Sequence, residues 1–116
     1  MTAEFKVISI GRPAVFLLPS DLMGVMIDGK TCRELVESYM SSKFGGFTDE
    51  GAGHNGYWRN DLGKTYSGKF QRYRVSFKGK NLIPELQGFL AYLAKHLDQE
   101  SIYLETGEDA WLVYPE

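Results

Sequence analysis

The chain has 116 residues, 43% of them hydrophobic, with 15 acidic and 13 basic side chains. This length and composition predict one globular domain spanning residues 1–116 and leave no room for a second. The single cysteine, Cys32, excludes an intramolecular disulfide and a cysteine-ligated metal site, and it fits a reducing cytoplasm.

The sequence shows no membrane or export signal. Its longest strongly apolar stretch, Ala14–Leu18, is far shorter than the roughly 20 residues that cross a bilayer. The N-terminus also lacks the basic-then-apolar pattern of a signal peptide. We therefore expect a soluble, cytoplasmic and unprocessed protein with no membrane partner.

Charge is unevenly distributed along the chain. Seven basic residues and one acid, Asp61, lie between Arg59 and Lys80, whereas six acids and no Lys or Arg lie between Asp98 and Glu116. The two segments attract each other within a subunit or between subunits, and the basic one also attracts an anionic ligand. Alternatively, each segment is a solvated face. Because the overall pI is about 5.7, nonspecific nucleic-acid binding is not expected.

The first predicted elements are extended. Phe5–Ile10 is rich in β-branched residues and predicts a strand, which Gly11, Arg12 and Pro13 interrupt before the apolar run Ala14–Leu18. We expect one bent strand or two short ones. Pro13 cannot donate a backbone hydrogen bond, so it suits an edge or a bulge.

A helix is predicted to begin at Thr31, because Thr31 and Glu34 have the spacing of a capping box. Gly45 and Gly46 are expected to end it, since glycine adopts the left-handed conformation that a helix end requires. The predicted apolar stripe consists of Cys32, Leu35, Val36, Tyr39, Met40 and Phe44.

The region from Gly45 to Gly68 is rich in glycine and predicts turns. Thr48 opens a short strand, the Asn55-Gly56 pair favours a tight hairpin turn, and a second turn is expected at Asp61–Lys64. The segment Gly51–Gly56 superficially resembles a phosphate-binding loop. It lacks both the Lys-Ser/Thr pair of a P-loop and the glycine spacing of a dinucleotide fingerprint.

A clear strand is predicted over Lys69–Lys78, with Tyr73, Val75 and Phe77 on one face and Arg72, Arg74 and Ser76 on the other. A second helix follows Asn81, with Pro84 in its first turn. Two further strands, Ser101–Glu105 and Ala110–Tyr114, flank a turn at Thr106–Asp109. The apolar stripe of this helix is Leu86, Phe89, Leu90, Leu93 and Leu97.

The order of these elements predicts an α+β, ferredoxin-like split β-α-β (β-α-β-β-α-β) sandwich with a C-terminal hairpin extension. Two helices would pack on one face of an antiparallel sheet, and the opposite face, which carries Arg72 and Arg74, would stay bare. A chain this small often covers such a face with another subunit, so we expect a homo-oligomer, either a dimer or a trimer.

Neither of the two histidines predicts a site on its own. His96 is expected near the C-terminal end of the second helix, where a cation suits the helix dipole. His54 lies in the glycine-rich region, either as an exposed turn residue or as a general base, and no other histidine or cysteine has metal-ligand spacing with it. We therefore predict no metal, no cofactor and no catalytic residue, and whether the chain is an enzyme stays open.

The best predicted binding cluster combines aromatic rings with guanidinium groups, as a planar anionic or nucleotide-like ligand requires. The competing interpretation is an interface in which Arg72 and Arg74 pair with Glu105, Glu108 or Asp109 of a neighbouring subunit. The predicted ligand-binding residues are Tyr57, Trp58, Arg59, Tyr66, Arg72 and Arg74.

The segments Phe44–Thr48, Gly56–Trp58, Asp98–Tyr103 and Ala110–Val113 resemble a pattern of small uncharacterised bacterial and phage proteins. That pattern is similar to trimeric, PII-like domains with a ferredoxin-like fold, which include the phage S-adenosylmethionine lyases. The resemblance implies a sheet-lined oligomer whose ligand sites lie between subunits, and it supports the fold more than the function.

The same resemblance implies a catalytic carboxylate where the basic strand begins, but this chain has Lys69, Phe70 and Gln71 there. Glu105 can replace it only if the fold brings Glu105 into the same cleft. Our leading hypothesis is a noncatalytic oligomeric domain that binds a small anionic ligand between subunits. The alternatives are a lyase or hydrolase acting on a nucleoside-containing substrate such as S-adenosylmethionine, and a protein-interaction or inhibitor module whose acidic segment, residues 98–116, engages a basic partner.

Overall fold

The computed structural model describes residues 6–8, 11–77, 82–107 and 110–115, in which two α-helices pack against an antiparallel sheet. In chain order the elements are β1 (Arg12–Pro19), the 3-10 turn η1 (Ser20–Leu22), β2 (Met26–Ile27), β3 (Lys30–Thr31), α1 (Cys32–Phe44), β4 (Thr48–Asp49), β5 (His54–Arg59), β6 (Thr65–Phe77), α2 (Leu82–His96), β7 (Ile102–Thr106) and β8 (Ala110–Val113).

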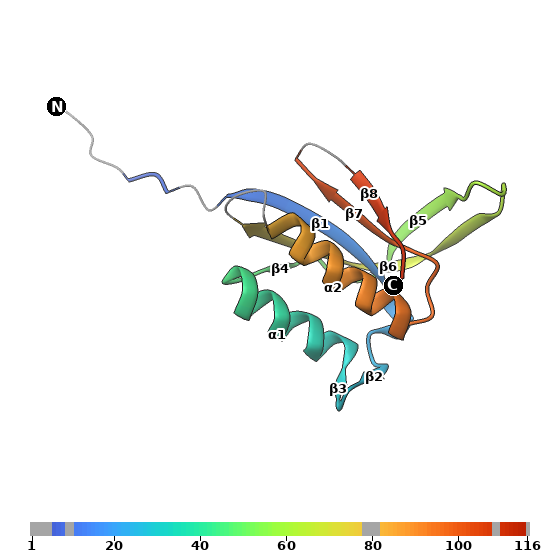
Figure 1. The fold of residues 1–116 in the computed structure, drawn as a ribbon, viewed down its shortest axis with the longest axis horizontal. Helices are drawn as coiled ribbons and strands as arrows, with labels where there is room; N and C mark the ends of the chain where they lie inside the picture. Colours follow the sequence, from blue (N-terminus) through green and yellow to red (C-terminus); the bar gives the residue numbers. More distant parts are fainter. Residues whose placement is uncertain (1–5, 9–10, 78–81, 108–109, 116) are drawn as a thin grey trace.

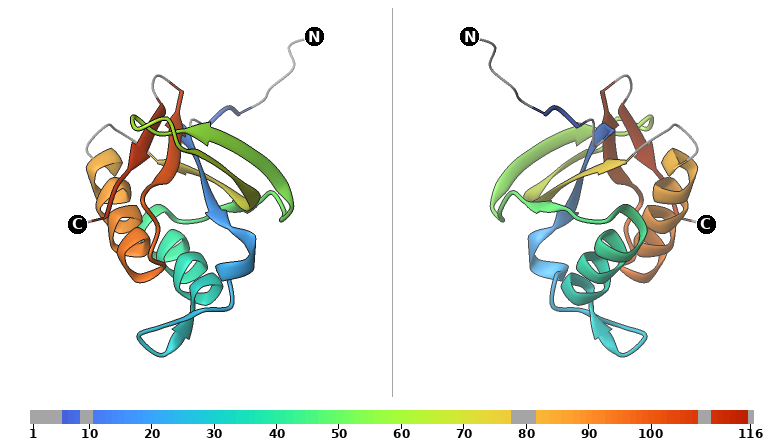
Figure 2. Two further views of the ribbon diagram at one scale, coloured as in Figure 1. Left: turned by 90° about the vertical axis from the view of Figure 1, so that its right-hand side faces the viewer. Right: turned by 90° about the vertical axis from the view of Figure 1, so that its left-hand side faces the viewer.

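The main sheet has the strand order β4-β6-β1-β7-β8, and β5 also pairs with β6. With β4 and β5 taken as one interrupted strand, this is the predicted ferredoxin-like arrangement, extended by the β7–β8 hairpin. Figure 1 and Figure 2 show α1 and α2 side by side on one side of the sheet. We call the other side, to which Val15, Arg72, Arg74 and Glu105 point, the open face.

The hydrophobic core lies between the sheet and the two helices, and it follows the alternation of side chains along each strand. In β6, Tyr73, Val75 and Phe77 are at most 2% exposed and belong to the core. The intervening Arg72 and Arg74 point to the open face, as predicted. The whole predicted stripe of α2 is also buried: Leu86, Phe89, Leu90, Leu93 and Leu97.

Both predicted ends of α1 are confirmed. The Thr31 hydroxyl accepts a hydrogen bond from the Glu34 amide at 3.1 Å, and the Glu34 carboxylate accepts one from the Thr31 amide at 3.1 Å. Gly45 ends the helix with φ at 81°. Cys32, in the first turn, is fully buried, and this burial raises the pKa of its thiol to about 11.

The predicted N-terminal strand is wrong in the part that the structure describes. Residues 6–8 form no strand, Val7 and Ile8 are 81% and 63% exposed, and β1 begins only at Arg12. The remainder of that predicted strand, Phe5 and residues 9–10, lies outside the described residues. β-branched side chains favour a strand only where a neighbouring strand offers packing, which residues 6–8 lack among the described residues.

Pro13 was expected at an edge or a bulge, but it lies in β1, which is a central strand of the sheet. Its position within β1 explains how the sheet accommodates it. The described pairs between β1 and β7 begin at Ala14, so Pro13 lies one residue beyond them and pairs with Ser76 of β6. Its missing N–H therefore removes no bond from the described β1–β7 ladder.

The Asn55-Gly56 pair does not form the predicted turn, because it lies inside β5, opposite Lys69 and Gly68. The chain turns instead at the second predicted position, Asp61–Lys64. There the Asn60 side-chain oxygen accepts hydrogen bonds from the amides of Leu62 and Lys64 at 3.0 and 2.9 Å. The strand β6 consequently begins at Thr65, four residues earlier than predicted, and forms a long hairpin with β5.

The packing of α2 on the sheet generates a stability prediction. Leu90 is fully buried, so Leu90→Ala should lower the free energy of unfolding by about 2–5 kcal/mol through lost burial and a new cavity. Leu62→Ala is the matched control, because Leu62 is 92% exposed and should change stability little. Urea unfolding of both variants checks this, and equal losses would contradict the described core.

Candidate functional site

Four charged side chains meet on the open face, and we call them the charged quartet: Glu50, Arg72, Arg74 and Glu105. Arg72 Nε donates to Glu50 Oε1 at 2.7 Å, and Arg74 Nε donates to Glu50 Oε2 at 3.1 Å. The terminal Nη2 of Arg72 lies 3.8 Å from Glu105 Oε1. The quartet therefore joins two cations and two anions within one subunit.

A bulge at the sheet edge places Glu50 in the quartet. The register against β6 shifts by two residues between the pairs Asp49–Tyr73 and His54–Phe70. Gly51 and Gly53 adopt φ values of 95° and 81°, which favour glycine. The segment Gly51–Gly56, which resembles a phosphate-binding loop, is thus a strand bulge followed by the first residues of β5.

The backbone of Arg72 pairs with Glu50 and Gly51, directly after β4, and so continues the hydrogen bonding between β4 and β6 up to the bulge. Its carbonyl accepts a hydrogen bond from the Glu50 amide at 2.9 Å, and its amide donates to the Gly51 carbonyl at 2.9 Å. Glu50 is therefore fixed beside Arg72 through the backbone as well as through its side chain.

The electrostatics of the quartet keep Glu50 ionised. The hydrogen bond from Arg72 contributes most, and together with Arg74 it lowers the pKa of Glu50 below its usual value of 4.5. A carboxylate held this way is a weak proton acceptor at neutral pH. The side chains of Arg72 and Glu50 are 29% and 26% exposed, so solvent reaches both of them.

Further along β6 from the quartet, a hollow of about 740 Å³ opens at the base of the β5–β6 hairpin; we call it the aromatic hollow. Phe70 and Tyr66 line it together with Pro19, Asp21 and Gln99. The Phe70 ring leans over Gly68, because a Cβ added to Gly68 would lie 3.6 Å from two atoms of that ring. Two aromatic rings together with a carboxylate and an amide in one lining suit a flat, hydroxylated group.

Side-chain contacts tie the β5–β6 hairpin to the segment that precedes β7. Asn60 Nδ2 donates to Glu100 Oε1 at 3.3 Å and lies 3.5 Å from the Tyr66 hydroxyl. A hydrogen bond with Glu100 also raises the pKa of Tyr66. The hairpin therefore bends toward the segment that precedes β7.

The structure divides the predicted binding cluster between the two sides of the hairpin. Tyr66, Arg72 and Arg74 occupy alternate positions of β6 and point to the same side of that strand. Tyr57 and Arg59 pair with Ser67 and Thr65, which point to the opposite side, and Tyr57 is 74% exposed.

One residue of the predicted cluster, Trp58, and the acids predicted to pair with the cluster's arginines across an interface fall outside this division. Trp58 lies opposite Tyr66 in the strand register, but its side chain is outside what the structure describes. Of the acids predicted to face the arginines from a neighbouring subunit, Glu105 contacts Arg72 within the chain, and Glu108 and Asp109 lie outside the described residues.

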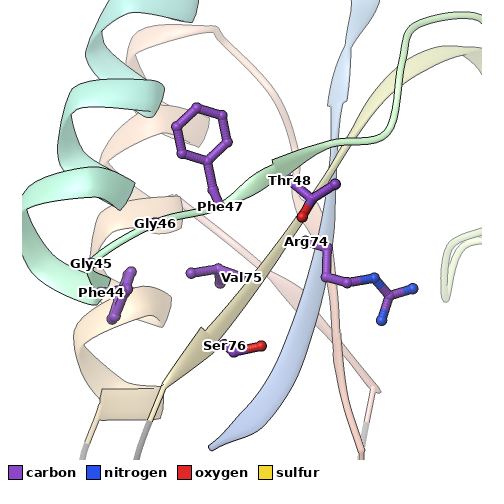
Figure 3. A pocket seen from close by; sticks show the side chains of 8 residues that line it. All are labelled: Phe44, Gly45, Gly46, Phe47, Thr48, Arg74, Val75 and Ser76. Atoms are coloured by element: carbon purple, nitrogen blue, oxygen red, sulfur yellow. The ribbon is translucent and has the colours of Figure 1, made fainter. Parts of the chain in front are cut away.

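A second hollow, of about 390 Å³, lies where β4 begins beside β6. Phe44, Phe47 and Val75 form its apolar part, and Gly45 and Gly46 complete the wall. Figure 3 shows the guanidinium of Arg74 turned away from these apolar side chains. Arg74 therefore borders this hollow through its stem and directs its charge elsewhere.

A polar network behind the sheet was missed by the sequence analysis. Arg33 of α1 donates to Asp49 Oδ2 at 3.3 Å and to the buried Gln71 at 3.1 Å, and the Tyr73 hydroxyl donates to Glu37 at 3.1 Å. Desolvation, followed by the nearby Glu37 charge, raises the pKa of Tyr73. The one available signal was Gln71, a polar residue at an inward position of β6.

The remaining single-residue predictions concern the histidines and metals. His96 lies in the last turn of α2, as predicted, with Nδ1 3.0 Å from the Tyr92 carbonyl. His54 is exposed in β5 rather than in a turn, and its Nε2 lies 2.9 Å from the Glu50 carbonyl. Within the described residues, no group of three or more His, Cys, Asp or Glu is arranged to hold a metal ion.

None of the helices in the described ranges combines the length and the apolar character that a transmembrane span requires.

No family model matches the chain, and no curated protein matches it. Two solved structures resemble it over nearly its whole length. One is a phage SAM lyase in complex with S-methyl-5′-thioadenosine, at a TM-score of 0.61 and 14% identity, covering 99% of this chain and 98% of that chain. The other is a phage SAM lyase in the apo state, at 0.62 and 13%, covering 98% of both chains. The predicted distant similarity to phage S-adenosylmethionine lyases is confirmed, and at these identities the likeness shows the fold.

The ion pairs of Glu50 generate a pH prediction. Because its pKa is lowered in the folded chain, its contribution to stability is present above about pH 4.5 and is lost as the pH falls through the folded-state pKa. Glu50→Gln should therefore lower the free energy of unfolding at pH 7, by about 1 kcal/mol or less since the pair is partly exposed.

This difference between Glu50→Gln and the unsubstituted protein should shrink between pH 5 and pH 2. Urea unfolding across that range measures it. A difference that stays constant with pH would show that Glu50 contributes through packing rather than charge.

Proposed function

We propose that the chain is a homo-oligomeric domain that binds a small nucleoside-containing ligand on its open face, with S-adenosylmethionine as the chemical model. The observation that supports it most is that the rings of Tyr66 and Phe70 and the guanidiniums of Arg72 and Arg74 come from alternate positions of β6, and therefore from one side of that strand. The fold that carries them resembles phage SAM lyases over almost all of both chains. One of those lyases was solved with S-methyl-5′-thioadenosine, a nucleoside thioether.

The charge of the quartet favours a zwitterion over a polyanion. Each arginine is already balanced by a carboxylate, because Glu50 bridges both guanidiniums and Glu105 lies near Arg72. An amino-acid group carries one carboxylate and one ammonium, so it can meet a guanidinium and a carboxylate at the same time. A triphosphate, in contrast, would bring several negative charges toward Glu50 and Glu105.

The spacing along β6 suits a ligand with a ring at one end and charge at the other. Phe70, Arg72 and Arg74 alternate on one side of the strand. From Phe70 to Arg74 the strand rises roughly 13 Å at about 3.3 Å per residue. A nucleoside in the aromatic hollow would thus have its charged chain directed along β6 toward the quartet.

The proposed oligomer follows from the exposure of this site. The charged side chains of the quartet are between 26% and 41% exposed in one subunit, which is more open than a ligand pocket. A second copy placed over the open face would enclose the ligand and exclude water from its ion pairs.

We propose binding without catalysis as the leading function. Glu50, the carboxylate nearest both arginines, is a weak base because its pKa is lowered. Lys69, Phe70 and Gln71 supply no carboxylate at the position implied by the lyase resemblance. Glu105 is the observation that favours the lyase alternative, because it reaches the same face, 3.8 Å from Arg72.

Binding is tested by titration calorimetry with S-adenosylmethionine and with S-methyl-5′-thioadenosine. Arg72→Ala and Arg74→Ala should each weaken S-adenosylmethionine binding by about tenfold, in line with a lost charge-assisted hydrogen bond. The thioadenosine, which lacks the amino-acid group, should be affected much less.

Lys95→Ala is the matched control for these titrations, since it removes one exposed positive charge from α2. No heat of binding at millimolar ligand would remove the proposal. Light scattering on the same samples tests the oligomer, and a monomer at every concentration would contradict that part.

Turnover separates the two candidate functions. We expect S-adenosylmethionine to stay intact during prolonged incubation with the protein, as followed by chromatography for S-methyl-5′-thioadenosine. Formation of that product above a protein-free blank, and its loss in Glu105→Gln, would establish the lyase alternative instead.

A further inference from the structure

Resting on the proposed function, we infer that Glu50 is the positioning residue of the open face: it presets both arginines for a ligand carboxylate and sets the charge selectivity of the site. We base this role on the nitrogen atoms that donate to the Glu50 carboxylate. Glu50 accepts from Nε of Arg72 and Nε of Arg74, one through each carboxylate oxygen, at 2.7 and 3.1 Å.

A contact through Nε orients a guanidinium while leaving its terminal nitrogens available. Arginine carries five N–H donors in a rigid planar fork, and an Nε contact uses one of them. Within the described part of the chain, the partner of Arg72 Nη2 is Glu105 at 3.8 Å, which is beyond hydrogen-bond length. Glu50 therefore acts as a brace: its carboxylate fixes the orientation of both guanidinium groups and leaves their terminal nitrogens available.

The backbone makes this brace rigid. The bulge at Gly51 and Gly53 holds Glu50 beside Arg72 through two backbone hydrogen bonds of 2.9 Å. The preceding residue, Asp49, is fixed from the other side of the sheet by Arg33 and Gln71. Held at both ends, Glu50 loses little further freedom when a ligand binds, which is the energetic benefit of preorganisation.

The negative charge of Glu50 has a second effect, on selectivity. With Glu50 present, the paired arginines carry a net charge of about +1 and not +2, and Glu105 lowers the local charge further. A ligand with one carboxylate is accepted, whereas a polyphosphate meets repulsion from both carboxylates.

Orientation and charge can be separated by matched variants. Glu50→Asp keeps the charge but shortens the side chain by one methylene, so one carboxylate no longer spans both Nε atoms. Glu105→Gln removes one negative charge from the same face without touching Arg74. Glu50→Gln removes the charge at Glu50 itself. Lys95→Ala again serves as the distant control.

Two measurements read these variants. The first is the NMR signal of the arginine Nε–H groups in the free protein, which a bound carboxylate protects from exchange with water. We expect protected signals for Arg72 and Arg74 in the unsubstituted protein and in Glu105→Gln, and faster exchange in Glu50→Asp. Equal exchange in Glu50→Asp and the unsubstituted protein would overturn the positioning role.

The second measurement is the affinity for S-adenosylmethionine and for ATP. Glu50→Asp should weaken S-adenosylmethionine binding by about threefold to tenfold and leave ATP binding weak. Glu105→Gln and Glu50→Gln should both strengthen ATP binding by about threefold or more, since each removes a repulsive charge. Unchanged ATP affinity in both Gln variants would overturn the selectivity role.

The failure of the proposed function gives a different pattern. If the unsubstituted protein binds neither S-adenosylmethionine nor ATP, the proposed function fails, while the exchange of the Nε–H groups still decides whether Glu50 braces the arginines. If it binds S-adenosylmethionine and Glu50→Asp binds it equally well, the proposed function stands and this inference is wrong.

Discussion

The alternation of inward and outward side chains along β6 is the constraint on which both the core and the open face depend. Burial of Tyr73, Val75 and Phe77 beneath the helices fixes which way the intervening residues point. Arg72 and Arg74 are thereby directed to the open face by the free energy of forming the core. A slip of one residue would bury two guanidiniums and expose three large apolar side chains, so the core itself holds the charged site in register.

A second device, the bulge, brings a carboxylate to those arginines. Without the two inserted residues, β4 and β5 would run as one continuous strand along β6. The insertion interrupts that edge directly after Glu50, whose amide bonds to the Arg72 carbonyl. The positive φ values at Gly51 and Gly53 favour glycine there. The bulge that these glycines form places the carboxylate of the neighbouring Glu50 beside the two arginines.

Most of the architecture could be predicted from local patterns. The capping box at Thr31, the glycine stop at Gly45 and the apolar stripe of α2 are short-range signals, and the structure contains all three. The turn predicted at Asn55 and Gly56 was wrong because turn preference is a local property of the sequence. Pairing with Lys69 and Gly68 across the hairpin determines their conformation instead.

The candidate site was predictable only in part for the same reason. Arg72 and Arg74 follow from alternation within one strand, so the sequence is sufficient to place them on the open face. Glu50 lies 22 residues away from Arg72 in the chain and meets it only through sheet pairing. Arg33 and Gln71 are likewise joined across 38 residues. No spacing rule connects such pairs, because their proximity is a product of topology.

The environment of Cys32 has a practical consequence. The only thiol in the chain is fully buried at the start of α1, and burial keeps it in the protonated, unreactive form. A maleimide or disulfide reagent can attack it only in molecules whose core has opened. The rate of labelling would therefore report conformational opening directly, with no probe introduced and no residue of the charged face altered.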